Sequence, residues 1–132
     1  MFIDASALVA IIAGEADCED LRLRLKAHRK RTISPLAEFE AALALARLRK
    51  ITVADALDLV KGFKKIYAVK EIGIEPQLAT IAIQAFQRYG RGQGHKAKLN
   101  MGDCFSYACA KDSDVPLLFK GNDFSQTDIK IA

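Results

Sequence analysis

The chain has no tryptophan, only two histidines and only three cysteines in its 132 residues. Cys18, Cys104 and Cys109 form no CxxC pair and have no companion histidines. This pattern argues against both a disulfide framework and a zinc site. We therefore expect three reduced thiols and a cytoplasmic protein.

Long hydrophobic runs are also missing. The longest, from Ala5 to Gly14, is about ten residues, which is too short to span a bilayer. It follows an aspartate instead of the basic segment that opens a secretory signal. The chain has no P-loop and no GxGxxG pattern, so it offers no glycine-rich phosphate cradle of these kinds. The sequence predicts a protein without a membrane segment, whose N-terminus is part of the fold.

The composition is that of a globular protein, with 51% hydrophobic and 27% charged residues. The length predicts a single domain over residues 1–132. Lys and Arg number 20 against 16 Asp and Glu, which gives a net charge of +4. The basic residues cluster at 28–31, 61–65 and 88–98, which favours a polyanionic partner.

Short apolar segments alternate with helical patterns along the chain. We expect strands at Phe2–Ile3, Ile72–Ile74, Val115–Phe119 and Ile129–Ile131, and a short strand or a turn at Arg31–Ser34. We expect helices near residues 7–13, 16–27, 35–50, 52–65, 76–89 and 101–111, the first of them capped by Ser6. This alternation predicts an α/β sandwich around a mostly parallel sheet. In such sheets, ligands bind outside the carboxyl ends of the strands.

Three aspartates fall where this rule would bring them together. Asp4 ends the first strand, Asp103 begins a helix, and Asp123 follows the strongest strand of the second half. Each also has a structural alternative. Asp4 could be a turn residue or a helix cap, Asp103 a helix N-terminal acid, and Asp123 a turn former. Because like charges repel, their gathering at one edge would indicate a divalent cation.

The segment SPLAEFEAALAL supplies a fourth acid, and two glutamates compete for the role. At about 100° per residue, Leu36, Phe39 and Leu43 share one helix face. Glu40 lies on the same face, whereas Glu38 points almost the opposite way. A carboxylate on a core-facing stripe needs a cation or metal partner. We therefore select Glu40, with a solvated or salt-bridged helix residue as the alternative.

The four acids form a ligand set made of oxygen alone. Without a His or Cys pattern, such a set selects Mg²⁺ or Mn²⁺ over zinc. These ions activate water and stabilise charge on a scissile phosphate. Acids beside basic segments therefore predict a metal-dependent nuclease, in which the acids hold the metal and the basic surface binds the strand.

Four segments carry a resemblance to a known family: FIDASALVAI, SPLAEFEAALAL, AKLNMGDCFSYACAK and PLLFKGNDFSQTDI. Over essentially its whole length, the chain resembles the PIN-domain ribonucleases, and specifically the VapC-type toxins of prokaryotic type II toxin–antitoxin systems. The resemblance implies a three-layer α/β/α sandwich around a mostly parallel sheet. It also implies a Mg²⁺-dependent endoribonuclease site, with the catalytic acids Asp4, Glu40, Asp103 and Asp123.

Within that site we assign separate roles. Asp4 and Asp103 are expected to bind the principal Mg²⁺, with Mn²⁺ as a possible substitute. Glu40 and Asp123 complete the site directly or through water, and Glu40 orients or deprotonates the attacking water. The resemblance places Ser6 close to the waters of the metal.

Two other segments contribute further candidates. Asn122 and Asp128 lie in the last motif, either beside the metal ligands or as turn residues, and a turn role is favoured for Asp128. The candidates for RNA binding are Arg88, Arg91, Lys96 and Lys98, with a solvated loop as the alternative. His95 could touch RNA, although a lone loop histidine is usually just exposed.

The resemblance also implies partners: an RNA substrate, a cognate VapB-type antitoxin that blocks the acidic pocket, and a second copy of the chain in a homodimer. Two rival functions remain open. One is a non-catalytic RNA- or protein-binding module with the same fold. The other is a phosphotransfer enzyme, because Asp4-Ala5-Ser6 after a strand is similar to a phosphoaspartate site and Lys120 could serve as its lysine.

Overall fold

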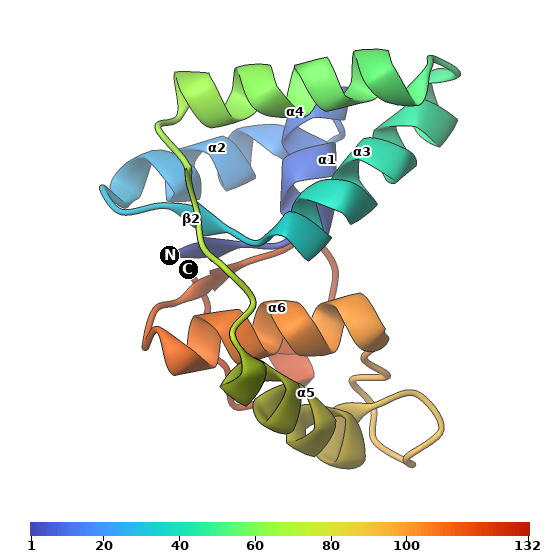
Figure 1. The fold of residues 1–132 in the computed structure, drawn as a ribbon, viewed down its shortest axis with the longest axis vertical. Helices are drawn as coiled ribbons and strands as arrows, with labels where there is room; N and C mark the ends of the chain where they lie inside the picture. Colours follow the sequence, from blue (N-terminus) through green and yellow to red (C-terminus); the bar gives the residue numbers. More distant parts are fainter.

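The computed structural model describes residues 1–132 and shows helices on both faces of a small sheet (Figure 1). The four strands lie in the order β3-β2-β1-β4, and every neighbouring pair is parallel. They span Phe2–Ile3 (β1), Thr32–Ile33 (β2), Lys70–Glu71 (β3) and Leu117–Leu118 (β4). The expected three-layer α/β/α sandwich is confirmed.

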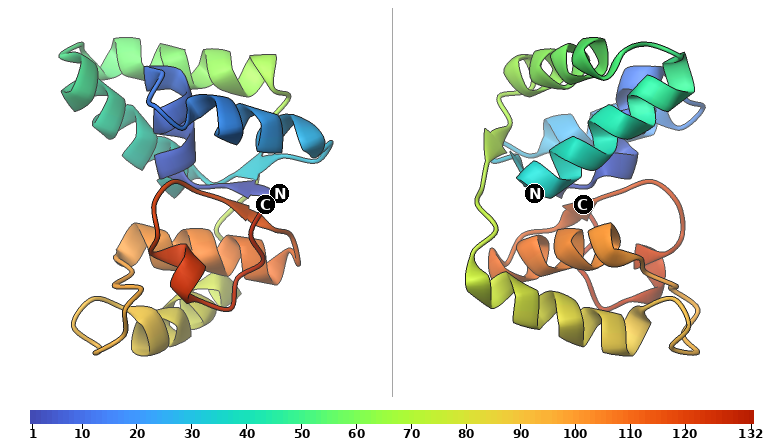
Figure 2. Two further views of the ribbon diagram at one scale, coloured as in Figure 1. Left: turned by 180° about the vertical axis from the view of Figure 1, so that it is seen from behind. Right: turned by 45° about the vertical axis from the view of Figure 1, so that its right-hand side comes forward.

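Six helices make up the outer layers. One face carries α1 (Ala5–Ala13), α2 (Cys18–Ala27), α3 (Pro35–Arg49) and α4 (Val53–Ile66). The other face carries α5 (Pro76–Tyr89) and α6 (Met101–Asp112), as Figure 2 also shows. A 3-10 turn, η1 (Phe124–Gln126), interrupts the C-terminal loop. None of these helices has both the length and the apolar character needed to cross a membrane.

The two central strands lie in the middle of the hydrophobic core. Phe2, Ile3, Leu117 and Leu118 are all fully buried, because helices cover the sheet on both sides. Burying one such large side chain contributes about 1.5–3 kcal/mol to folding. The strands that lead into the candidate site are therefore held in place by the core itself.

The second half of the sheet is shorter than predicted. The strand expected over Val115–Phe119 covers only Leu117–Leu118. Pro116 has no N–H to donate to a ladder, although its carbonyl accepts a hydrogen bond from the Phe2 N–H at 2.8 Å. The strand expected over Ile129–Ile131 is reduced to one bridge, between Ile131 and Leu117.

Two other predictions need correction. The strand placed at Ile72–Ile74 lies at Lys70–Glu71, because these residues pair in register with Thr32 and Ile33 of β2. The helix expected to begin at residue 16 begins at Cys18. Tertiary pairing, more than the local apolar pattern, decides where such short elements lie.

The strand order creates a topological switch between β1 and β4. The chain leaves β1 toward β2 on one side and returns from β3 to β4 on the other side. At such a point the connections diverge and leave a crevice outside the carboxyl ends of the strands. Asp4 directly follows β1 there, and Lys120 follows β4.

Candidate functional site

A cleft of about 460 Å³ lies at this switch point. Its walls come from the end of β1, from α1 and α3, from the N-terminus of α6 and from the segment after β4. The polar and charged side chains that line it are Asp4, Ser6, Glu15, Glu40, Arg47, Asn100, Asp103 and Lys120. Three of the four predicted acids thus share one cavity.

Asp4 is almost fully buried, with 4% of its surface exposed, and it caps α1. Its Oδ2 accepts hydrogen bonds from the Ser6 N–H at 2.9 Å and the Ser6 hydroxyl at 2.5 Å. The Lys120 N–H donates to Ser6 Oγ at 3.0 Å, so β4 helps to fix the same carboxylate. The prediction that Ser6 caps the helix is wrong, because α1 begins at Ala5 and Asp4 takes the capping position. The second oxygen of Asp4, Oδ1, makes no hydrogen bond within the protein.

Asp103 uses its carboxylate in a similar way. Its Oδ2 accepts from the Asn100 N–H at 2.8 Å, and Asn100 Oδ1 accepts from the Asp103 N–H at 3.0 Å. This reciprocal capping box starts α6 and leaves Asp103 Oδ1 without a protein partner. From the sequence, a structural role at the helix start and ligand binding were alternatives for Asp4 and Asp103. In the structure the two roles are compatible, because each carboxylate uses one oxygen at the helix start and leaves the other without a protein partner.

The cleft disfavours negative charge on Asp103. Burial is the main cause that raises the pKa of Asp103 to about 6, and the charges of Asp4 and Asp123 add to it. The Asn100 N–H and the nearby Arg91 act in the opposite direction. Asp103 therefore lies in a site where a cation would be stabilising.

Glu40 enters the same cleft from α3 without a hydrogen-bond or ion-pair partner. Burial, followed by the charges of Asp4 and Asp103, raises the pKa of Glu40 to about 7. Gly102 lies directly against this carboxylate, and a Cβ at that position would collide with both Glu40 oxygens. Sequence reasoning missed Gly102, although its place before Asp103 in LNMGDCF was the available signal.

The structure places Glu40 in the cleft and Glu38 outside it, but the reason given from the sequence is wrong in part. The stripe with Glu40 does not face the core, because Phe39 is 59% exposed and lines the cleft. The buried side of α3 is formed by small residues and one leucine: Ala37, Ala41, Ala42, Leu45 and Ala46. Glu38 pairs with Lys64, with Nζ to Oε2 at 2.7 Å, and is thereby neutralised.

Asp123 stands at the margin of this group. It is exposed, lies just before η1, and makes no capping hydrogen bond with its side chain. Its charge contributes to the raised pKa of Asp103, but Asp123 does not line the cleft itself. The neighbouring Asn122 accepts the Ser125 hydroxyl on its backbone oxygen at 2.6 Å, which is a turn contact.

The lining residues suit a hard divalent cation. Carboxylate oxygens are preferred ligands of Mg²⁺ and Mn²⁺, and the free oxygens of Asp4, Asp103 and Glu40 are of this kind. No three His, Cys, Asp or Glu side chains already stand close enough to enclose an ion. Mg²⁺ needs no such cage, because it commonly keeps several waters and binds through one or two carboxylates.

Basic side chains border the acids inside the cleft. Arg47, in the last turn of α3, lines the cavity. The Lys120 ammonium pairs with Glu15 and lies 3.7 Å from Asp17, both in the connection between α1 and α2. Lys120 is thus not directed at Asp4 as a phosphotransfer site would require, and only its backbone N–H supports Asp4 through Ser6.

A second basic surface follows α5. Arg91, His95, Lys96 and Lys98 line a hollow without hydrophobic residues in the glycine-rich loop of residues 90–98. Gly92 and Gly94 adopt φ angles of 85° and 79°, which glycine reaches without strain. Arg88 belongs instead to the last turn of α5, where its guanidinium lies 5.0 Å from the centre of the Tyr89 ring.

Together, the fold and the cleft define an α/β protein with an acidic site at the switch point of a parallel sheet. Residues 1–130 match the family model of the PIN domain, so the chain belongs to the PIN-domain family. Curated relatives place it, more narrowly, among the VapC ribonucleases. It is 43% identical to a VapC ribonuclease of Rhizobium meliloti (strain 1021), over 97% of this chain and 98% of the relative.

Two further comparisons agree with this placement. The chain is 35% identical to ribonuclease VapC42 of Mycobacterium tuberculosis, over 100% of this chain and 98% of that protein. It also matches the crystal structure of Mycobacterium tuberculosis VapC20, described as a Sarcin-Ricin loop cleaving toxin, with a TM-score of 0.74. That match covers 99% of this chain and 97% of the other at 19% identity, so it shows a shared fold.

Proposed function

We propose that this protein is a Mg²⁺-dependent endoribonuclease toxin of a type II toxin–antitoxin module, with Mn²⁺ as an alternative cofactor. The observation that carries the proposal is the cleft in which Asp4, Glu40 and Asp103 gather with carboxylate oxygens left unpartnered. The similarity to VapC ribonucleases supports RNA as the substrate.

Asp4 and Asp103 are the residues that would hold the metal through their free Oδ1 atoms. When bound, a divalent ion lowers the pKa of water and neutralises charge on the scissile phosphate. Ser6 keeps Asp4 in the orientation that exposes Oδ1, and the Lys120 N–H keeps Ser6 in place. Asp123 completes the site from the C-terminal loop.

Glu40 is the proposed base. Glu40 lies in the cleft with Asp4 and Asp103 but makes no hydrogen bond or ion pair within the protein, so its carboxylate is free to accept a proton. Glu40 would accept a proton from the attacking water as the water oxygen bonds to phosphorus, while the bond from phosphorus to the leaving ribose oxygen breaks and that oxygen takes a proton from solvent. A ribose 2′-OH nucleophile is not required.

The RNA backbone is proposed to lie between Arg47 in the cleft and the basic loop of residues 90–98. Arg47 lines the cleft from α3, and Arg91 is close enough to Asp103 to lower its pKa. Lys96 and Lys98 extend the positive charge along the loop. Such contacts bind phosphates and position the strand, but they carry no sequence preference directly.

Two apolar surfaces suit the proposed protein partners. A groove between the α1–α2 region and α4, lined by Ile12, Leu59 and Ile66, is a candidate surface for a VapB-type antitoxin. A second groove between α5 and α6, lined by Ile83, Phe86 and Met101, is a candidate for a homodimer. Light scattering of the purified chain, alone and with the product of the neighbouring small open reading frame, tests whether the two assemblies form.

The activity is tested on purified protein with structured RNA, in Mg²⁺, in EDTA and as Asp4→Asn and Asp103→Asn. Asparagine caps helices about as well as aspartate at position 4, and at position 103 its side-chain oxygen can still accept from the Asn100 N–H, so both variants should fold while losing the ligand charge. We expect cleavage to disappear in EDTA and to fall at least about 100-fold in each variant. RNA binding without cleavage in the wild type would instead establish the non-catalytic module.

A further inference from the structure

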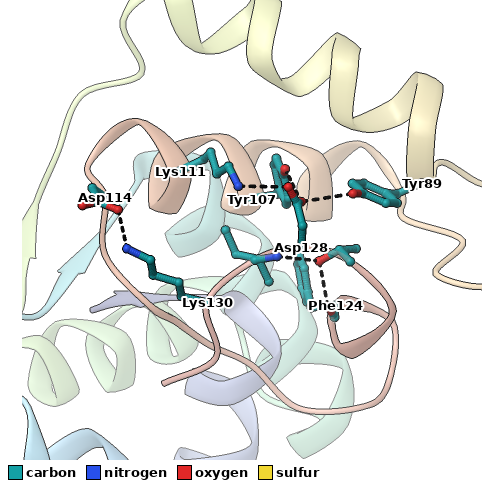
Figure 3. Close-up of polar contacts among 9 residues, drawn as sticks. Tyr89, Tyr107, Lys111, Asp114, Phe124, Asp128 and Lys130 are labelled. Carbon is teal, nitrogen blue, oxygen red and sulfur yellow. Dashed lines mark hydrogen bonds and ion pairs between the residues drawn. The ribbon is translucent and has the colours of Figure 1, made fainter.

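A second polar cluster lies at the end of the C-terminal loop, where one carboxylate, Asp128, meets three donors (Figure 3). The hydroxyls of Tyr107 and Tyr89 donate to Asp128 Oδ1 at 2.7 Å and 3.1 Å. The Lys111 ammonium donates to Oδ2 at 3.1 Å. The Tyr107 hydrogen bond is the largest of the influences that lower the pKa of Asp128 to about 2. Both tyrosine side chains are buried, and their hydroxyls donate to the same charged acceptor.

Two of the three donors, Tyr107 and Lys111, belong to α6, the helix whose N-terminus lines the cleft. Tyr107 and Lys111 follow Asp103 at successive four-residue steps along α6, so all three share one side of that helix. Tyr89 ends α5 immediately before the basic loop, and the His95 ring of that loop packs on it with ring centres 5.0 Å apart. Asp128 therefore contacts both the helix of Asp103 and the base of the basic loop.

Asp128 also closes the loop that carries Asp123. At its start, the loop is held by the Lys120 N–H on Ser6. In the middle, the Phe124 ring packs against Phe119 with centres 5.0 Å apart. Between these points Asp123 has no capping hydrogen bond of its own. Its position thus depends on how the loop is anchored.

We infer that Asp128 is a positioning residue, which sets Asp123 relative to Asp103 by tying the C-terminal loop to α6 through Tyr107 and Lys111. The inference rests on the proposed metal-dependent function and adds to it a residue outside the cleft. It replaces the expectation that Asp128 is only a turn residue. Through Tyr89, the same carboxylate also holds the base of the basic loop against the acidic site.

The test measures Mn²⁺ binding to the full chain without RNA, by electron paramagnetic resonance or calorimetry. The variants are Tyr107→Phe, which removes one hydroxyl, and Asp128→Asn. We expect the Kd for Mn²⁺ to rise roughly tenfold in both, as for other residues that orient metal ligands. The matched control is Asp114→Asn, which breaks the exposed pair with Lys130 (2.6 Å, Figure 3) and should leave the Kd unchanged.

A double-mutant cycle separates positioning from general loss of structure. In an Asp123→Asn background, Tyr107→Phe should leave the Mn²⁺ Kd unchanged, because its effect acts through Asp123. An equal loss in both backgrounds, or no loss in either, overturns the inference. A wild type that binds no Mn²⁺ refutes the proposed function and this inference with it. If Asp128→Asn does not fold, Tyr107→Phe alone decides between these outcomes.

Discussion

The carboxylates in the cleft and the single carboxylate of the Asp128 cluster have opposite surroundings. In the cleft, burial and neighbouring acids raise the pKa of Glu40 to about 7 and that of Asp103 to about 6. At the other cluster, two tyrosines and a lysine lower the pKa of Asp128 to about 2. An acid with matching donors stabilises the fold. Acids gathered with neighbouring acids and with oxygens left unpartnered oppose folding, and such sites are candidates for binding and catalysis.

The largest expected effect separates two glutamates on one helix. Glu40→Gln should lower the rate of RNA cleavage by roughly 100-fold, because it removes the proposed base. Glu38→Gln should leave cleavage nearly unchanged and lower the free energy of unfolding by about 1 kcal/mol, since Glu38 pairs with Lys64. Single-turnover rates and thermal unfolding measure the two effects. Equal loss of activity in both variants would contradict the assignment.

A glycine pair gives a smaller effect with a matched control. Gly102→Ala places a Cβ against the Glu40 carboxylate and should displace it, with a loss of roughly tenfold in cleavage rate. Gly62→Ala lies in α4, where a Cβ meets no other atom, and should raise stability by about 0.5–1 kcal/mol with unchanged activity. If Gly102→Ala cleaves RNA at the wild-type rate, the close approach of Gly102 to the Glu40 carboxylate is not needed for activity.

The smallest effect concerns the pH dependence of stability without metal. The pKa values of Glu40 and Asp103 lie above their ordinary values, so the folded state binds more protons than the unfolded state between about pH 4 and 7. The unfolding temperature in EDTA should therefore fall as the pH rises through this window, by about 5 °C.

Two comparisons check the origin of that pH effect. Glu40→Gln should flatten the change in unfolding temperature above about pH 5, where Glu40 would otherwise ionise. Asp128 acts in the opposite direction and only at lower pH, because its pKa is lowered and its contribution disappears as the pH falls toward 2. An unfolding temperature that rises between pH 5 and 7 in wild type would contradict the cleft's raised pKa values.

Local patterns in the sequence were enough to predict the layers and most helix ends. Thr52 caps α4 by accepting from the Asp55 N–H, and Pro76 opens α5, because capping acts within a few residues. The strand predictions at Ile72–Ile74 and Val115–Phe119 were less accurate, since strand pairing involves residues far apart in the chain. The family placement was confirmed by comparison with known proteins.

The geometry of the site depended on contacts that the sequence does not display. Asp128 meets Tyr107 and Tyr89 across 21 and 39 positions, so a local reading shows only a turn. Asp4 uses one carboxylate oxygen for capping and leaves the other free, and this arrangement can be recognised only once the position of Ser6 is known. The direction of the Glu40 face was misjudged because alanines, rather than the larger residues, form the buried side of α3.

The most direct test of this account is a crystal of the protein soaked in Mn²⁺ and measured for anomalous scattering. We predict a peak between the Oδ1 atoms of Asp4 and Asp103, within reach of Glu40, and no peak at Asp128. The absence of a peak in the cleft at saturating Mn²⁺, or a peak at Asp128 instead, would contradict the distinction between the two clusters.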